Sequence, residues 1–297
     1  MRRYIAACVL CLIGLPALAA ELIVVDPEAR YPEGPLWRAG KLFYVEYAQS
    51  NINAWDGHRS RVYWHRDHCG ASAVIPFHDH LLVACYDENA LVELDGAGKT
   101  VRLIRTDSSG KPFIGPNDFA ADNHGGIYFS ASGVYDLKAP ISGTVLYLTT
   151  DGRSVSEVAN TIHYSNGLTV SRDQQHLLVA EMLAARILSF PIAANGALGP
   201  RTVWARLQDL AAPTPNEDAY NGPDGLKLGP DGNYYIAQNG SGRILVVDEQ
   251  RKLVRTIELP TPYVTNMGFG PNGAVFITGA FEQWKPPFPG AVYRWTK

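Results

Sequence analysis

The feature of this sequence that most constrains its fold is a strand–turn–strand phrase that recurs along the chain. The clearest copy runs from Tyr220 to Ala237, where two apolar strands flank the turn Pro230-Asp231-Gly232. Asp and Gly suit such a turn because both tolerate a positive φ. Repeats of about 40 to 50 residues are typical of the blades of a β-propeller. The recurrence therefore predicts a repeat fold in which each copy builds one blade.

The phrase occurs six times, and further strand candidates follow each copy. The copies start near Glu33, Ala71, Asn117, Asn166, Asp224 and Asn266. The sixth copy lacks a fourth strand, whereas 22–25 at the other end of the chain forms a strand without a partner. Pairing the two would leave no free sheet edge. We therefore predict an all-β, six-bladed β-propeller with four antiparallel strands per blade, closed by the N-terminal strand joining the last blade.

The N-terminus has the pattern of a secretory signal peptide. Arg2 and Arg3 precede a short apolar run that ends at the small-residue site Ala17-Leu18-Ala19. A membrane anchor is the weaker alternative, because the run is shorter than the roughly 20 residues that a membrane-spanning helix needs. We expect residues 1–20 to be removed and residues 21–297 to form one propeller, exported to a periplasm or to the outside, with no membrane span in the mature chain.

Charge and cysteine content limit the partners and the compartment. A net charge of -3 with no basic stripe argues against nucleic acid as a partner and leaves a small-molecule ligand, while the oligomeric state stays open. Cys69 and Cys85 are the two cysteines of the mature chain. In an oxidising compartment they would form a disulfide; the alternative is two small buried side chains.

Polar residues stand at the start of the innermost strand in five of the six predicted blades. These residues are Glu33, Asn117, Asn166, Asp224 and Asn266, and blade two offers Ser72 or a neighbour. Each one alone is the kind of residue that forms a turn, but turn formation does not explain one shared position in five blades. At the mouth of a propeller channel, two carboxylates and several amide oxygens would form a cage for one divalent cation. Hard oxygen donors favour Ca²⁺, Mg²⁺ or Mn²⁺, with Zn²⁺ still allowed.

The order of these motifs resembles the SMP-30/gluconolactonase family, which also includes luciferin-regenerating enzyme. The matching stretches are Glu33-Gly34-Pro35-Leu36-Trp37, Asn117-Asp118, Ser165-Asn166-Gly167-Leu168, Pro223-Asp224-Gly225 and Thr265-Asn266 with Phe269-Gly270. The resemblance implies a six-bladed propeller that hydrolyses sugar lactones with a divalent metal, most often Ca²⁺. It also implies that Glu33, Asn166 and Asp224 bind the metal, that Asn117 binds substrate or completes the metal shell, and that Asn266 has a further part in the site. Gly115 stands where the family's sugar lactonases often carry Arg, so the resemblance does not extend to gluconolactone itself.

The predicted reaction is the opening of a lactone by water. A divalent ion would polarise the carbonyl, and Asp224 would orient or deprotonate the water. His163 lies three residues before Asn166, where it would either relay protons or be an ordinary loop histidine. No Gly-x-Ser-x-Gly motif of a serine esterase is present. The alternative function is a non-enzymatic propeller that binds a ligand or protein and has a structural metal at the channel mouth.

Overall fold

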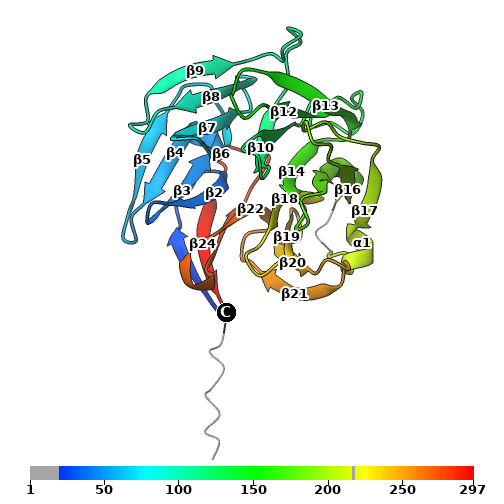
Figure 1. The fold of residues 1–297 in the computed structure, drawn as a ribbon. Helices are drawn as coiled ribbons and strands as arrows, with labels where there is room; N and C mark the ends of the chain where they lie inside the picture. The colour runs from blue at the N-terminus through cyan, green and yellow to red at the C-terminus, as the bar shows by residue number, and fades with distance from the viewer. Residues whose placement is uncertain (1–19, 216–217) are drawn as a thin grey trace, which may run out of the picture.

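The computed structural model describes residues 20–215 and 218–297, and the predicted signal peptide lies outside these residues except for Ala20. The described chain forms six four-stranded antiparallel sheets arranged around a central axis (Figure 1). The predicted six-bladed, almost entirely β fold is therefore confirmed. Within the described residues no helix has the length and apolar character that would span a bilayer.

Five blades follow the simple order of the chain. Their strands are β2 (Pro32–Arg38), β3 (Lys41–Glu46), β4 (Asn51–Trp55) and β5 (Ser60–His65); β6 (Ala71–Phe77), β7 (His80–Cys85), β8 (Ala90–Leu94) and β9 (Thr100–Ile104); β10 (Pro116–Ala121), β11 (Ile127–Ala131), β12 (Gly143–Leu148) and β13 (Val155–Ile162); β14 (Ser165–Val170), β15 (His176–Glu181), β16 (Arg186–Pro191) and β17 (Thr202–Arg206); β18 (Pro223–Leu228), β19 (Tyr234–Gln238), β20 (Arg243–Val247) and β21 (Leu253–Glu258). A short helix, α1 (Leu207–Leu210), follows β17.

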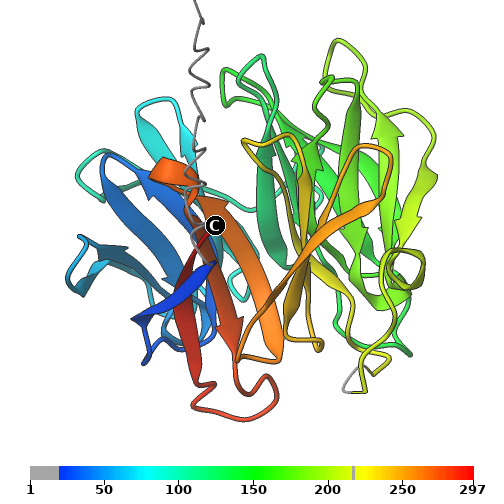
Figure 2. The same ribbon diagram turned by 90° about the horizontal axis from the view of Figure 1, so that it is seen from below.

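The sixth blade joins the two ends of the chain. It contains β22 (Tyr263–Phe269), β23 (Val275–Ala280) and β24 (Gly290–Thr296), and its outer strand is β1 (Glu21–Asp26). Leu22 pairs with Trp295 and Val24 with Tyr293 in an antiparallel register. Figures 1 and 2 show this closure, with the blue first strand beside the red last strand. The prediction that the N-terminal strand completes the last blade is confirmed.

The first strand of each blade lines the centre of the ring. The strands β2, β6, β10, β14, β18 and β22 contact one another in a closed circle, and in Figure 1 they lie nearest to the axis. The second and third strands carry most of the fully buried side chains, including Tyr44, Leu82, Phe129 and Ile236, which pack between neighbouring blades. The hydrophobic cores therefore lie between the sheets, and the starts of six strands are left to face a common central space.

Candidate active site

Irregular starts of the inner strands determine where their polar side chains point. In β10, β14 and β18 the pairing with the second strand skips one extra residue, between Pro116 and Phe119, between Ser165 and Leu168, and between Pro223 and Leu226. Such bulges interrupt the ladder and redirect a side chain. Asn117, Asn166 and Asp224 each lie within one of these bulges.

In blade one the polar residue stands one position earlier than in the other three. Glu33 still pairs with Val45, and the register shift follows it. Gly34 has a φ of +46°, and a Cβ atom at this position would lie 2.8 Å from the Cα of Ala73 in the next blade. Only glycine combines this conformation with so close an approach, which allows Glu33 to reach the centre.

The starts of the inner strands surround a cavity of about 270 Å³, which we call the site cavity. Glu33, Asn117, Asn166 and Asp224 all line it. Blade two contributes Ser72, whose hydroxyl donates a hydrogen bond to the carbonyl oxygen of Asn117 at 2.9 Å. Residues that are distant in the sequence thus meet in one cavity; their roles as ligands remain predictions.

The two carboxylates of the site cavity have no basic side chain beside them in its described lining. Glu33 is 8% exposed and Asp224 is 4% exposed, and no Lys, Arg or His is among the described residues that line the cavity. Burial raises the pKa of Glu33 well above its usual range, and the charges of Asp224 and Asp118 raise it further. Burial also raises the pKa of Asp224, an effect that hydrogen bonds from Asn239 and Asn166 partly oppose. The surroundings of the two carboxylates therefore favour neutralisation of their charge, either by a bound cation or by bound protons.

A second set of side chains, not predicted from the sequence, contacts the polar residues that line the site cavity. Nδ2 of Asn117 donates to Oγ of Ser132 at 3.0 Å, Nδ2 of Asn166 lies 3.4 Å from Sδ of Met182, and Nδ2 of Asn239 donates to Oδ2 of Asp224 at 3.1 Å. Ser132, Met182 and Asn239 each directly follow the second strand of their blade. This shared position could have identified them from the sequence, because an antiparallel second strand ends beside the start of the inner strand.

Seven aromatic residues form the wall of the site cavity, and we call them the aromatic collar. They are Tyr31, Tyr47, Tyr86, Tyr135, Tyr164, Trp284 and Phe288. Ring centroids of successive members are 4.7 to 6.5 Å apart, from Phe288 through Tyr31, Tyr47, Tyr86, Tyr164 and Tyr135 to Trp284. Trp284 and Phe288 both lie in the loop 281–289 between β23 and β24, so a single loop closes the collar.

Two predicted site residues are not among those that line the site cavity. Asn266 lies deeper in the channel, where its Nδ2 donates to Asp118 at 3.3 Å. His163 donates its backbone N–H to Glu181 at 2.8 Å, and its buried Nε2 atom has no hydrogen-bond partner among the described residues. The parts of both residues in substrate binding or proton transfer stay predictions.

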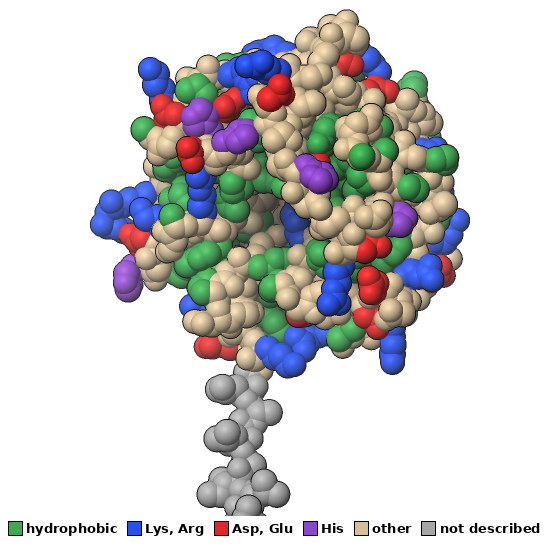
Figure 3. Space-filling model, viewed as in Figure 1, with side chains coloured by type: hydrophobic (Ala, Val, Ile, Leu, Met, Phe, Trp, Pro, Cys, Tyr) green, Lys and Arg blue, Asp and Glu red, His purple; other side chains and the backbone are tan. Residues whose placement is uncertain are grey.

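A charged layer closes the channel below the site cavity. Nζ of Lys227 lies 2.7 and 2.8 Å from the two carboxylate oxygens of Asp118. Beyond it, the ends of the inner strands line a second cavity of about 420 Å³, with mainly apolar walls and Lys227 as its basic residue. Figure 3 shows a central hollow bordered by hydrophobic side chains, with a basic side chain in its depth. Asp118 already forms an ion pair with Lys227. Of the carboxylates in this region, Glu33 and Asp224 therefore remain available to a ligand.

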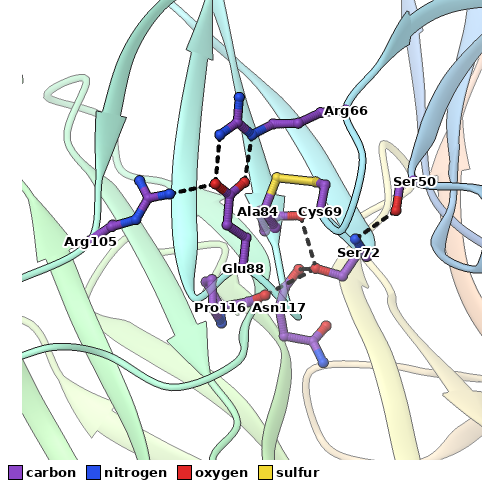
Figure 4. Close-up of a disulfide and its surroundings, with 11 residues drawn as sticks. Ser50, Arg66, Cys69, Ser72, Ala84, Glu88, Arg105, Pro116 and Asn117 are labelled. Atoms are coloured by element: carbon purple, nitrogen blue, oxygen red, sulfur yellow. Dashed lines mark hydrogen bonds and ion pairs between the residues drawn. A yellow bond between two sulfur atoms is a disulfide. The ribbon is translucent and has the colours of Figure 1, made fainter.

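The two cysteines form a disulfide next to the site. Cys69 precedes β6 and Cys85 ends β7, and the bond joins them across a separation of 16 residues. Figure 4 shows the disulfide beside Ser72, whose hydroxyl interacts with the carbonyl oxygens of Ala84, Pro116 and Asn117. The disulfide thus fastens the start of the inner strand of blade two where that strand meets blade three.

The donors of the site cavity fit a hard divalent cation. No group of three or more His, Cys, Asp or Glu residues suitable for a metal occurs in the described part of the chain, so a metal here would be bound by two carboxylates and amide oxygens. Oδ1 of Asn239, 1% exposed and beside Asp224, has no hydrogen-bond partner among the described residues. Oxygen donors with a summed charge of about -2 match the preference of Ca²⁺ or Mg²⁺.

The fold and the site define a class of protein: a six-bladed propeller with a buried, oxygen-rich site at one end of its channel. A family model described as SMP-30/Gluconolactonase/LRE-like region matches residues 31–281. The chain therefore belongs to this family, as the motifs predicted.

Individual relatives are distant but extend over most of the chain. Lactonase drp35 of Staphylococcus aureus (strain MRSA252) is 27% identical over 234 residues, which cover 75% of this chain and 68% of that protein. Among solved structures, a gluconolactonase from Xanthomonas campestris has a TM-score of 0.75 at 22% identity, covering 93% of this chain and 89% of that one. The calcium-binding protein regucalcin from Agrobacterium tumefaciens has a TM-score of 0.75 at 19% identity, covering 91% of this chain and 92% of that one. At these identities the solved structures establish the fold alone.

Proposed function

We propose that this protein is an exported, metal-dependent lactonase that opens a cyclic ester with water. The observation that carries the proposal is the pair of buried carboxylates, Glu33 and Asp224, which face one cavity with amide oxygens around them and no basic side chain in the lining. Membership of a family that includes lactonases supports the reaction class. A relative named as a calcium-binding protein supports Ca²⁺ as the ion.

Glu33, Asn166 and Asp224 would hold the cation, and Asn117 would complete its shell or contact the substrate. When bound, the ion would supply electrophilic stabilisation of the oxygen on which negative charge develops as water adds to the carbonyl. Asp224 would orient the attacking water and accept its proton. The bond between the carbonyl carbon and the ring oxygen would break, and the leaving ring oxygen would receive the proton that Asp224 had accepted from the water.

The surrounding residues would hold the reacting groups in place and exclude water. Asn239 holds Asp224 in place by donating a hydrogen bond to one of its carboxylate oxygens. Burial, followed by the charges of Asp224 and Glu33, raises the pKa of Tyr31 well above its ordinary value. Its hydroxyl therefore remains protonated and can donate a hydrogen bond in the cavity. The disulfide supports export, because disulfides persist in oxidising compartments.

The test combines metal analysis with lactone hydrolysis. Purified residues 21–297 should contain one divalent ion per chain, and EDTA should abolish the hydrolysis of a panel of γ- and δ-lactones, with Ca²⁺ restoring it. Glu33→Gln and Asp224→Asn should lose both the ion and the activity. If Ca²⁺ raises the stability of the protein but the Ca²⁺-loaded protein hydrolyses no lactone, the result would instead indicate a binding propeller with a structural ion.

A further inference from the structure

We infer that the lactone opened in the site cavity is a small neutral one that carries an apolar substituent, alkyl or aryl, rather than a polyhydroxylated or anionic one. This inference rests on the proposed lactonase activity and specifies its substrate class. The observation behind it is the aromatic collar, which lines the same cavity as the two carboxylates.

The hydroxyl groups of the collar are largely committed to the protein. Four of its five tyrosines donate to protein acceptors: Tyr47 to Asp87 at 3.0 Å, Tyr86 to the carbonyl oxygen of Gly133 at 3.3 Å, Tyr135 to that of Tyr220 at 2.7 Å, and Tyr164 to the hydroxyl of Tyr86 at 3.1 Å. A ligand therefore meets the faces and edges of these rings more than their polar ends. Such walls stabilise apolar groups and leave the hydroxyls of a sugar without partners, which is costly once water is displaced.

The remaining polar groups are too few to recognise a polyhydroxylated ring. Away from the two carboxylates and the amides beside them, the lining offers Ser72, the hydroxyl of Tyr31 and Gln283, whose Nε2 has no hydrogen-bond partner among the described residues. The Ser72 hydroxyl is surrounded by three carbonyl oxygens at 2.9, 3.0 and 3.3 Å, so its proton is already used within the protein. Selective binding of a polyol needs a partner for each buried hydroxyl, and the cavity does not supply them.

Charge excludes an anionic substituent. No Lys, Arg or His lies among the described residues that line the site cavity, and two carboxylates do. A divalent cation would bring the local charge to about zero, which leaves no excess positive charge for a phosphate or carboxylate group. The channel's own lysine, Lys227, is paired with Asp118 below the cavity.

The experiment compares δ-lactones that share one ring and differ in their substituents. The probes are unsubstituted δ-valerolactone, δ-octalactone with a propyl chain, dihydrocoumarin with a fused benzene ring, and glucono-δ-lactone with its hydroxyl groups. Each buried methylene should raise kcat/KM about fourfold, so we expect δ-octalactone and dihydrocoumarin to exceed glucono-δ-lactone at least tenfold in the Ca²⁺-loaded protein. Equal rates, or a preference for glucono-δ-lactone, would overturn the inference and leave the lactonase proposal standing. Hydrolysis of none of the four would count against the proposed function itself.

Variants in the loop 281–289 connect this preference to the collar. Trp284→Ala should lower the ratio of kcat/KM for δ-octalactone over glucono-δ-lactone at least fivefold, and Trp284→Phe should largely preserve it. Phe281→Ala is the matched control, because Phe281 lies in the same loop, is 47% exposed against 50% for Trp284, and does not line the cavity. An equal loss of preference in the Phe281 and Trp284 variants would refute the role of the collar.

Discussion

The substitution Glu33→Gln should stabilise the protein when metal is absent, although it removes a residue on which function depends. In the metal-depleted protein, burial raises the pKa of Glu33 above its reference value of 4.5, and the charge of Asp224 raises it further. Between the unfolded and the folded pKa, the folded protein binds more protons than the unfolded chain. The stabilising contribution of the protonated group is thus complete below about pH 4 and is lost as the pH rises through the folded pKa. The metal-depleted wild type should therefore become less stable as the pH rises from about pH 4 towards alkaline values.

The size of the effect follows from the cost of a buried group without a partner. That cost is about 1–3 kcal/mol or more for a charge, so Glu33→Gln should raise the free energy of unfolding by about 1–3 kcal/mol at about pH 8. For a domain of this size, each kcal/mol corresponds to about 2–4 °C in Tm. At about pH 4, below the ordinary pKa of a glutamate, the carboxyl group is protonated in the folded and the unfolded state alike, and the two proteins should differ little.

The assay is thermal unfolding followed by circular dichroism in EDTA at both pH values. Glu181→Gln provides the control, because Glu181 is equally buried but forms an ion pair with Arg186. Removing one partner of a buried pair is destabilising, so this variant should lose stability where Glu33→Gln gains it. With excess Ca²⁺ the order should reverse, since only the wild type gains the free energy of binding. A metal-depleted Glu33→Gln protein that melts below the wild type at high pH would refute the reasoning.

Three further predictions concern positions outside the carboxylate pair. Loss of the Cys69–Cys85 disulfide, by Cys85→Ser or by reduction, should lower the free energy of unfolding in denaturant by about 2–4 kcal/mol. An unchanged denaturation midpoint would show that the bond does not stabilise the fold. Gly34→Ala should cost at least about 2 kcal/mol, because Gly34 has a positive φ and a Cβ atom there would press on Ala73; a soluble variant with wild-type Tm would contradict this. Asp231→Ala should cost about 1 kcal/mol through a weakened turn and keep wild-type kcat/KM, whereas an inactive Asp231 variant would mean that the wrong aspartate had been assigned to the site.

The sequence predicted the repeat architecture well because each blade carries its own local instructions. Apolar runs separated by turns such as Asp231-Gly232 define hairpins, and a repeat of hairpins with one strand missing at one end and one strand extra at the other implies closure. The same reasoning placed Glu33, Asn117, Asn166 and Asp224 at the starts of inner strands, and all four line one cavity.

What the sequence did not predict depends on bulges and on loops. Glu33 stands just before the bulge of its strand, whereas Asn117 lies within its own. Asn266 comes just after the bulge of β22 and pairs with Thr278. A polar residue near the start of a strand therefore does not by itself show which side chain reaches the cavity. The aromatic collar arises from segments that carry no repeat, and tyrosine is too common in packed interiors for its position in a loop to indicate a wall.

The collar and the buried carboxylates are parts of one physical arrangement. Burial is the main reason why the pKa values of Glu33 and Asp224 rise, and the aromatic collar lines the cavity in which they are buried. The same burial makes any cation bound between them interact more strongly, since electrostatic interactions gain strength as the local dielectric falls. Widening the wall would lower the cost of the charged carboxylates in the metal-depleted protein, but it would also weaken their attraction for the ion. Affinity for a cation, instability without it and preference for apolar substrates should accordingly change together when the wall is altered, whereas a change of one carboxylate should alter the first two and leave the apolar wall intact.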